Sequence, residues 1–130
     1  MGSSKTWLLL CILAVSCLHD DDDARFVLIP VDTEASTVAD TGVVNEDIEA
    51  EITVVATNGC YSDLRVELEQ RDANHFIVKG VALNHKWPAC ADVMVYRTGK
   101  LTFRAATAGL YYFQMNQAPF DIRIDTIVIR

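Results

Sequence analysis

The sequence predicts an all-β protein, an antiparallel β-sandwich of seven to nine strands with one disulfide. Short runs rich in β-branched and aromatic residues recur about every 8–12 residues, and Gly, Pro, Asn and Asp separate them. No window carries a sustained apolar period of about 3.6 residues, which argues against a large helical content. The chain has 130 residues, of which 51% are hydrophobic, so a single domain with a substantial core accounts for its length.

The clearest strand covers residues 48–57. Ile48, Ile52 and Val54 share one face with two alanines, while glutamates lie on the opposite face, as expected for a half-buried strand. The same alternation marks the other runs, although Pro30 interrupts the first and predicts an edge strand or a kink. The predicted strands, in chain order, are residues 25–31, 48–57, 64–69, 76–83, 92–97, 101–105, 111–115 and 120–130.

The connections between these strands contain typical turn residues. Residues 32–45 are polar and irregular, with a turn predicted at 40–42. A longer loop covers residues 84–89, and the Thr-Gly-Lys sequence at 98–100 predicts a hairpin turn.

The last strand changes the parity of its apolar residues. Ile122 and Ile124 fall on one parity, whereas Ile127 and Ile129 fall on the other. If all four isoleucines face the core, one extra residue must be inserted between them, which predicts a β-bulge near residues 125–126.

Residues 107–113 read TAGLYYF, with Tyr111 two residues after Gly109. This segment resembles the tyrosine corner of immunoglobulin-like sandwiches, in which a tyrosine bends back to bond upstream backbone. The resemblance implies that residues 25–130 form an immunoglobulin-like sandwich and that Tyr111 makes this bond. Phe113 stands where an antibody domain has a cysteine, so the resemblance does not extend to the antibody disulfide.

Cys60 and Cys90 form an even pair within the predicted sandwich domain. A disulfide between them would close a loop of about 30 residues, which stabilises the fold by about 3.6 kcal/mol in the chain-entropy model. A metal site built from both thiolates is the alternative, but the sequence lacks a C-x-x-C spacing and a neighbouring His pair.

Residues 1–16 have the composition of a signal peptide. Lys5 supplies the positive end, and residues 7–15 form an apolar core that is too short to span a bilayer. Ala14 and Ser16 also suit ordinary cleavage after Ser16, so a plain secretory signal remains an alternative to the lipid-anchored form described next.

The sequence Ala-Val-Ser-Cys that ends at Cys17 resembles the lipobox of bacterial lipoproteins. Ala14 stands where that family usually has leucine. The resemblance implies that Cys17 becomes the first residue of the mature chain and carries lipid, so that the membrane is a partner through this group. Leu18 in place of an aspartate favours the outer membrane over retention at the inner membrane, and the expected location is the bacterial outer membrane or periplasm.

Residues 17–24 follow as a tether that contains His19 and four consecutive aspartates at 20–23. Adjacent carboxylates repel one another, which favours an extended spacer, with a weak divalent-cation site as the alternative. The whole chain carries a formal net charge of −7, from 11 Lys and Arg against 18 Asp and Glu. Such an acidic chain lacks the clustered cations that nucleic-acid binding needs.

No arrangement of residues predicts a catalytic site, a cofactor or a metal centre. The sequence has no G-x-S-x-G elbow, and His75 lies at a turn where a solvated side chain is expected. The Gly109–Phe113 pattern is also similar to the penultimate strand of cupredoxins, but neither Cys nor His follows Phe113, so a blue-copper site is not predicted. We therefore expect no enzymatic activity.

The loop before Cys90 holds the best binding candidates. Trp87 precedes Pro88 in this loop, and tryptophan is enriched at interaction hot spots, although Trp87 could instead cap one end of the core. If the disulfide forms, we expect a binding patch at one end of the sandwich, composed of Tyr61, His85, Lys86 and Trp87.

The sequence thus predicts an exported, lipid-anchored cell-envelope protein that acts as a non-enzymatic binding or structural module, for which an envelope protein is one partner class. Two alternatives stay open. One is a periplasmic metal-binding protein that uses residues 20–23 with His19 or His85, and the other is an inhibitor of a hydrolase that uses residues 84–89.

Overall fold

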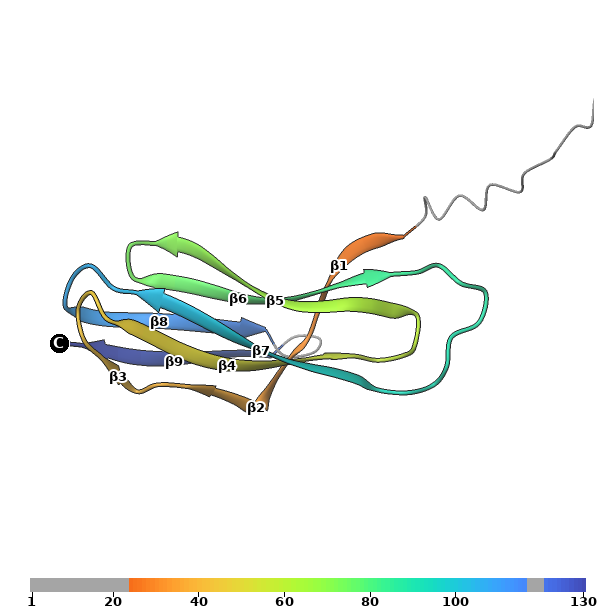
Figure 1. Ribbon diagram of the computed structural model, residues 1–130, viewed down its shortest axis with the longest axis horizontal. Coiled ribbons are helices and arrows are strands. Elements are labelled where there is room, and N and C mark those ends of the chain that lie inside the picture. Colours follow the sequence, from red (N-terminus) through yellow and green to blue (C-terminus); the bar gives the residue numbers. More distant parts are fainter. Residues whose placement is uncertain (1–23, 117–120) are drawn as a thin grey trace, which may run out of the picture.

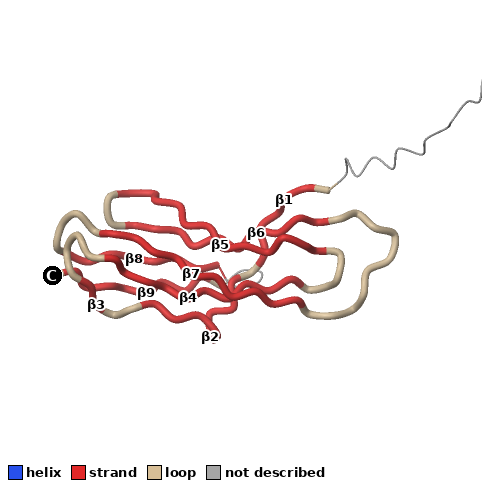
Figure 2. Tube along the Cα trace, viewed as in Figure 1, coloured by secondary structure: helices blue, strands red, loops and turns tan. Residues whose placement is uncertain are grey.

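The computed structural model describes residues 24–116 and 121–130. The predicted signal peptide, Cys17 and the aspartate run lie outside the described residues. The described chain is an elongated molecule of two facing layers (Figure 1). Strands make up both layers, and Figure 2 shows no helix among the described residues.

Nine strands follow one another along the described chain, as the alternation of apolar and polar residues predicts for most of them. Their bounds are β1 (Arg25–Ile29), β2 (Val31–Val38), β3 (Thr41–Gly42), β4 (Asp47–Ala56), β5 (Tyr61–Asp72), β6 (His75–Asn84), β7 (Val95–Arg104), β8 (Gly109–Asn116) and β9 (Ile122–Ile129).

The larger sheet has six strands and is organised around β6. One edge of β6 pairs with β5, while the other edge pairs with β1 along its C-terminal half and with β8 along its N-terminal half. β8 then pairs with β9, and β9 with the short β3. The smaller sheet has the order β2-β4-β7. Pro30 separates β1 from β2 and marks the point at which the chain crosses from the larger sheet to the smaller one.

The core fills the space between the two sheets. Phe113 of β8 is fully buried, and its ring centroid lies 5.2 Å from that of Phe76 and 4.7 Å from that of Phe103. These three rings come from β6, β7 and β8, so they join the two sheets. From β4, the alternating apolar residues predicted to share one face are all buried: Ile48, Ala50, Ile52, Val54 and Ala56.

The prediction of an all-β sandwich with seven to nine strands and one disulfide is confirmed. The tyrosine corner is also confirmed, because the Tyr111 hydroxyl donates a hydrogen bond of 2.9 Å to the carbonyl oxygen of Thr107. One difference concerns direction: β6 with β8 and β3 with β9 pair in parallel, whereas the other pairings are antiparallel.

The predicted hairpin turn at residues 98–100 is wrong, because β7 runs without interruption through this segment. Gly99 pairs with Ile52 of β4, and the Thr98 hydroxyl lies 2.8 Å from that of Thr53 on the same neighbouring strand. A Cβ atom on Gly99 would lie 3.2 Å from a methyl group of Val66, so this glycine permits a close approach to β5 and does not form a turn.

The predicted bulge near residues 125–126 is also wrong. β8 and β9 pair in continuous register from Gly109 opposite Ile129 to Asn116 opposite Ile122. The strand keeps its strict alternation, so Ile127 is buried and Ile124 points to the outside of the sheet. The segment 32–45, predicted to be irregular, contains β2 and β3, although β2 carries a shift in its register with β4.

Candidate functional site

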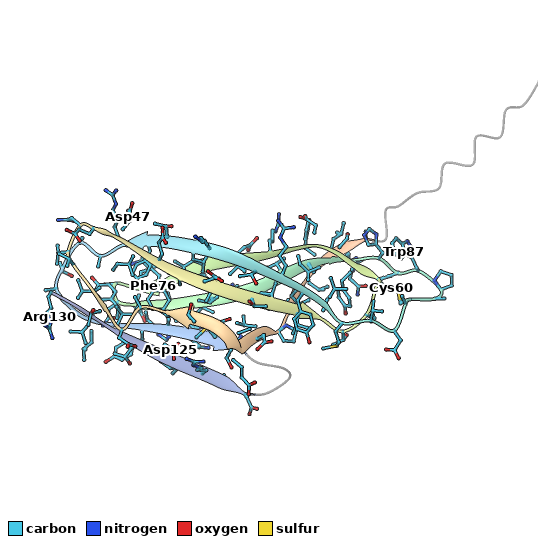
Figure 3. The ribbon with its side chains drawn as sticks, turned by 60° about the horizontal axis from the view of Figure 1, so that its bottom comes forward. Asp47, Cys60, Phe76, Trp87, Asp125 and Arg130 are labelled. Atoms are coloured by element: carbon cyan, nitrogen blue, oxygen red, sulfur yellow. A yellow bond between two sulfur atoms is a disulfide. The ribbon has the colours of Figure 1, made fainter. Side chains whose placement is uncertain are left out.

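The disulfide fixes the loop between β6 and β7 to the turn between β4 and β5. Cys60 and Cys90 are bonded, with their Cα atoms 5.1 Å apart. Backbone hydrogen bonds hold the same two segments together, from Gly59 to Ala91 at 2.8 Å and from His85 to Cys60 at 2.9 Å. The loop is therefore attached to the sandwich at both of its ends. Figure 3 shows this end of the molecule, with Cys60 and Trp87 labelled.

Trp87 is exposed at this end, and His85 beside it is half-buried. Their rings are stacked, with centroids 4.5 Å apart and planes inclined by 15°. The Nε2 atom of His85 lies 2.6 Å from the hydroxyl oxygen of Ser62, at hydrogen-bonding distance. This bond fixes the imidazole against which the indole is stacked. The indole itself lies on the surface, and Trp87 is 52% exposed. The structure therefore presents Trp87 on the surface and does not use it to cap the core.

The other two predicted patch residues take different places. Lys86 lies between the stacked residues in the chain and is exposed. Tyr61 is half-buried and packs against the hydrophobic core, so its side chain is not part of the exposed patch. Ser62, the next residue of β5, contacts His85 and was not among the residues predicted from the sequence.

The surface around Trp87 continues onto β1 and the outer face of the larger sheet. Because Val27 and Ile29 point inward, Phe26 and Leu28 point outward, where they are 52% and 68% exposed. Phe26 pairs with Leu83, which lies two residues before His85. We call Phe26, Leu28, His85 and Trp87 together the Trp87 edge.

A cation covers part of this edge. The guanidinium carbon of Arg65 lies 4.3 Å from the centroid of the Phe26 ring, a cation–π geometry. Arg65 also forms ion pairs with Glu67 at 3.2 Å and with Asp63 at 3.9 Å. Residues 26–29 are all apolar, so the sequence does not show which of them point outward. Arg65 comes from another strand, and only the fold brings it to Phe26.

A second apolar area lies on the outer face of β8 and β9. Leu110, Tyr112, Ile122 and Ile124 are exposed there. No charged residue occupies an outward position of these two strands within the described residues. This face contrasts with the outer side of the smaller sheet, where glutamates of β4 alternate with its inward apolar residues.

The described residues offer little for catalysis or metal binding. The Ser62–His85 pair has the spacing of a nucleophile and its base, but none of the side-chain hydrogen bonds among the described residues joins a carboxylate to His85. No three His, Cys, Asp or Glu side chains of the described chain lie close enough to hold a metal ion. His19 and residues 20–23, the other candidate ligands, lie outside the described residues.

The shifted pKa values belong to surface ion pairs away from this end. The Arg104 side chain donates a hydrogen bond to Asp47 and lowers the pKa of that carboxyl group. Lys79 does the same to Glu69 and lowers its pKa. These pairs join neighbouring strands within one sheet, as cross-strand pairs of opposite charge do, and they define no site.

No protein-family model matches the chain, and no curated protein or solved structure matches it either. Within the described residues, we find no helix with the length and apolar character needed to cross a membrane.

Proposed function

We propose that this chain is an exported bacterial cell-envelope protein, anchored by a lipid on Cys17, that acts as a non-enzymatic binding module. The observation that carries the binding role is the Trp87 edge, on which an exposed tryptophan is held in one place. The disulfide between Cys60 and Cys90 is compatible with the oxidising compartment that export would reach.

The physical argument for binding concerns entropy. A partner that buries Trp87 does not have to order a mobile loop, because the disulfide and two backbone hydrogen bonds already attach this loop to the sandwich. The stack on His85 restricts the indole further. Preorganised aromatic side chains of this kind contribute large contact areas at low entropic cost, which is why they dominate interaction hot spots.

Two measurements test the proposal. Mass spectrometry of the protein purified from membranes of its host should show cleavage before Cys17 and acyl chains on this residue. A photo-crosslinking amino acid at position 87 should capture a specific neighbour in the envelope, whereas the same group at Tyr96 should not. Tyr96 is a matched control because it is 57% exposed and pairs within the smaller sheet. An unmodified Cys17 refutes the anchor, and equal capture at both positions refutes the binding site.

A further inference from the structure

We propose that the Trp87 edge docks on the surface of the bilayer that holds the anchor, with Trp87, Phe26 and Leu28 inserted among the lipid headgroups. This inference rests on the proposed lipid at Cys17 and names the occupant of the edge. It concerns how the domain is oriented on the membrane, which the anchor alone leaves open.

The position of the chain end supports this inference. The described chain begins just before β1, and Arg25 pairs with Asn84, the neighbour of His85. The start of β1 and Trp87 therefore lie at the same place on the molecule, as Figure 3 shows. Arg25 is 25 − 17 = 8 residues from Cys17. Eight residues span at most about 28 Å, so a lipid on Cys17 keeps this edge close to the bilayer.

The chemistry of the edge fits the headgroup region. Tryptophan favours this region because its ring is apolar while its N–H can still bond to water or phosphate. Phe26 and Leu28 add exposed apolar area beside the end of β6, where Phe26 pairs with Leu83, two residues before the His85 ring on which Trp87 is stacked. Burial of these side chains among lipids is favourable, and the anchor raises the effective concentration of the surface that receives them.

Charges at the edge complement phosphate groups only in part. Arg25, Lys86 and the half-exposed Arg65 supply cations. Asp63 and Glu67 lie next to Arg65, and four aspartates precede Arg25 in the sequence. The carboxylates oppose adsorption to anionic lipids, so the apolar side chains must carry the docking. The proposal therefore predicts docking on a zwitterionic bilayer.

The position of the chain end gives no such support for the second apolar area, on β8 and β9. Its exposed isoleucines belong to β9, which runs away from the end of the molecule where β1 starts (Figure 1). Nothing about the chain end brings it to the bilayer, and we assign no occupant to it.

The test uses residues 17–130, which include every residue of the core described above. Trp87 is the only tryptophan in this range, and Cys17 is its only cysteine outside the disulfide. Cys17 can therefore be coupled to a maleimide-bearing lipid in phosphatidylcholine vesicles, and the emission of Trp87 reports on docking. Coupling should shift this emission to shorter wavelength, make it sensitive to nitroxide-labelled lipid and protect it from an aqueous quencher.

Variants show which side chains are responsible. Phe26→Ser should lower the ratio of docked to undocked chain about tenfold, because docking would bury the exposed half of the phenylalanine side chain and the variant lacks it. Leu28→Ser should act in the same direction. Tyr96→Ser is the matched control, because it removes a similarly exposed ring from the other sheet, and it should leave docking unchanged. Circular dichroism and the intact disulfide verify that each variant is folded.

Several outcomes would overturn the inference. Trp87 emission that does not change on coupling, or docking that Phe26→Ser and Tyr96→Ser affect equally, excludes this edge as the contact. Docking that occurs only on vesicles with anionic lipid excludes the apolar mechanism. Because the coupling is chemical, this result is independent of whether the host acylates Cys17. A failure of the anchor and a failure of the docking surface are therefore distinguishable.

Discussion

Replacement of Ile127 by alanine should destabilise the fold strongly, whereas the same replacement at Ile124 should be nearly neutral. Both residues belong to β9, and both changes remove the same atoms. Ile127 is fully buried between the two sheets, while Ile124 is 55% exposed on the outer face. The two variants therefore differ in burial and in little else.

The expected magnitudes follow from this burial. Truncation of a buried isoleucine to alanine costs about 2–5 kcal/mol, because transfer free energy is lost and a cavity remains. Ile127 lies opposite Tyr111 in the register, within the part of the core that joins the sheets, so the surroundings have little freedom to collapse. At Ile124 the loss should stay below about 1 kcal/mol, since more than half of the side chain is already in water.

Urea unfolding followed by circular dichroism measures both values. The midpoint should fall for the Ile127 variant with an unchanged slope, which would show that stability changed while the exposed area on unfolding did not. A typical domain is stable by about 5–15 kcal/mol, so the Ile127 variant should remain measurable. Equal losses at the two positions would refute the continuous register of β8 and β9 and restore the bulge predicted from the sequence.

Three further predictions concern other parts of the sandwich. Reduction of the Cys60–Cys90 disulfide should lower the free energy of unfolding by about 3.6 kcal/mol, and a thiol assay should detect neither sulfur before reduction. Tyr111→Phe should cost about 0.5–1.5 kcal/mol in urea unfolding, because the hydrogen bond from the buried Tyr111 to the Thr107 carbonyl is lost; no change would mean that the bond contributes nothing. Arg104 lowers the pKa of the exposed Asp47, so the stability that this pair contributes is fully present above about pH 4 and is lost as the pH falls through the lower folded value. Asp47→Asn should therefore lower the urea midpoint at neutral pH and leave it unchanged in strong acid, and a loss that persists in acid would exclude the ion pair as its cause.

The sequence predicts the fold best where a strand has one apolar and one polar face. In residues 48–56 the alternation identifies both the strand and its buried side. It fails in β9, because apolar residues lie on both faces and the sequence alone does not show which face is turned to the core. It also fails at Gly99, where a typical turn residue lies within a strand and a Cβ atom would lie only 3.2 Å from Val66 of the facing sheet.

The candidate site could also be predicted only in part from the sequence. Trp87 and His85 could be proposed from their loop and its cysteine, since these are local features of the chain. Ser62 could not, because its contact with His85 depends on the register between β5 and β6 and on the loop that leaves β6. The sequence shows that Phe26 is apolar, but it does not show that Phe26 is exposed.

The outward residues of β1 show why an apolar run alone is ambiguous. Residues 26–29 are all apolar, and a fully buried strand would have the same sequence. In the structure only alternate residues of this run face the core, and Phe26 and Leu28 are left in water, which costs free energy unless another surface covers them. Arg65 covers only part of the Phe26 ring, Leu28 is 68% exposed, and the chain that precedes β1 carries the proposed lipid. A bilayer reached through that lipid would cover the side chains that the fold leaves exposed, and the Phe26→Ser comparison separates this explanation from simple tolerance of a surface aromatic residue.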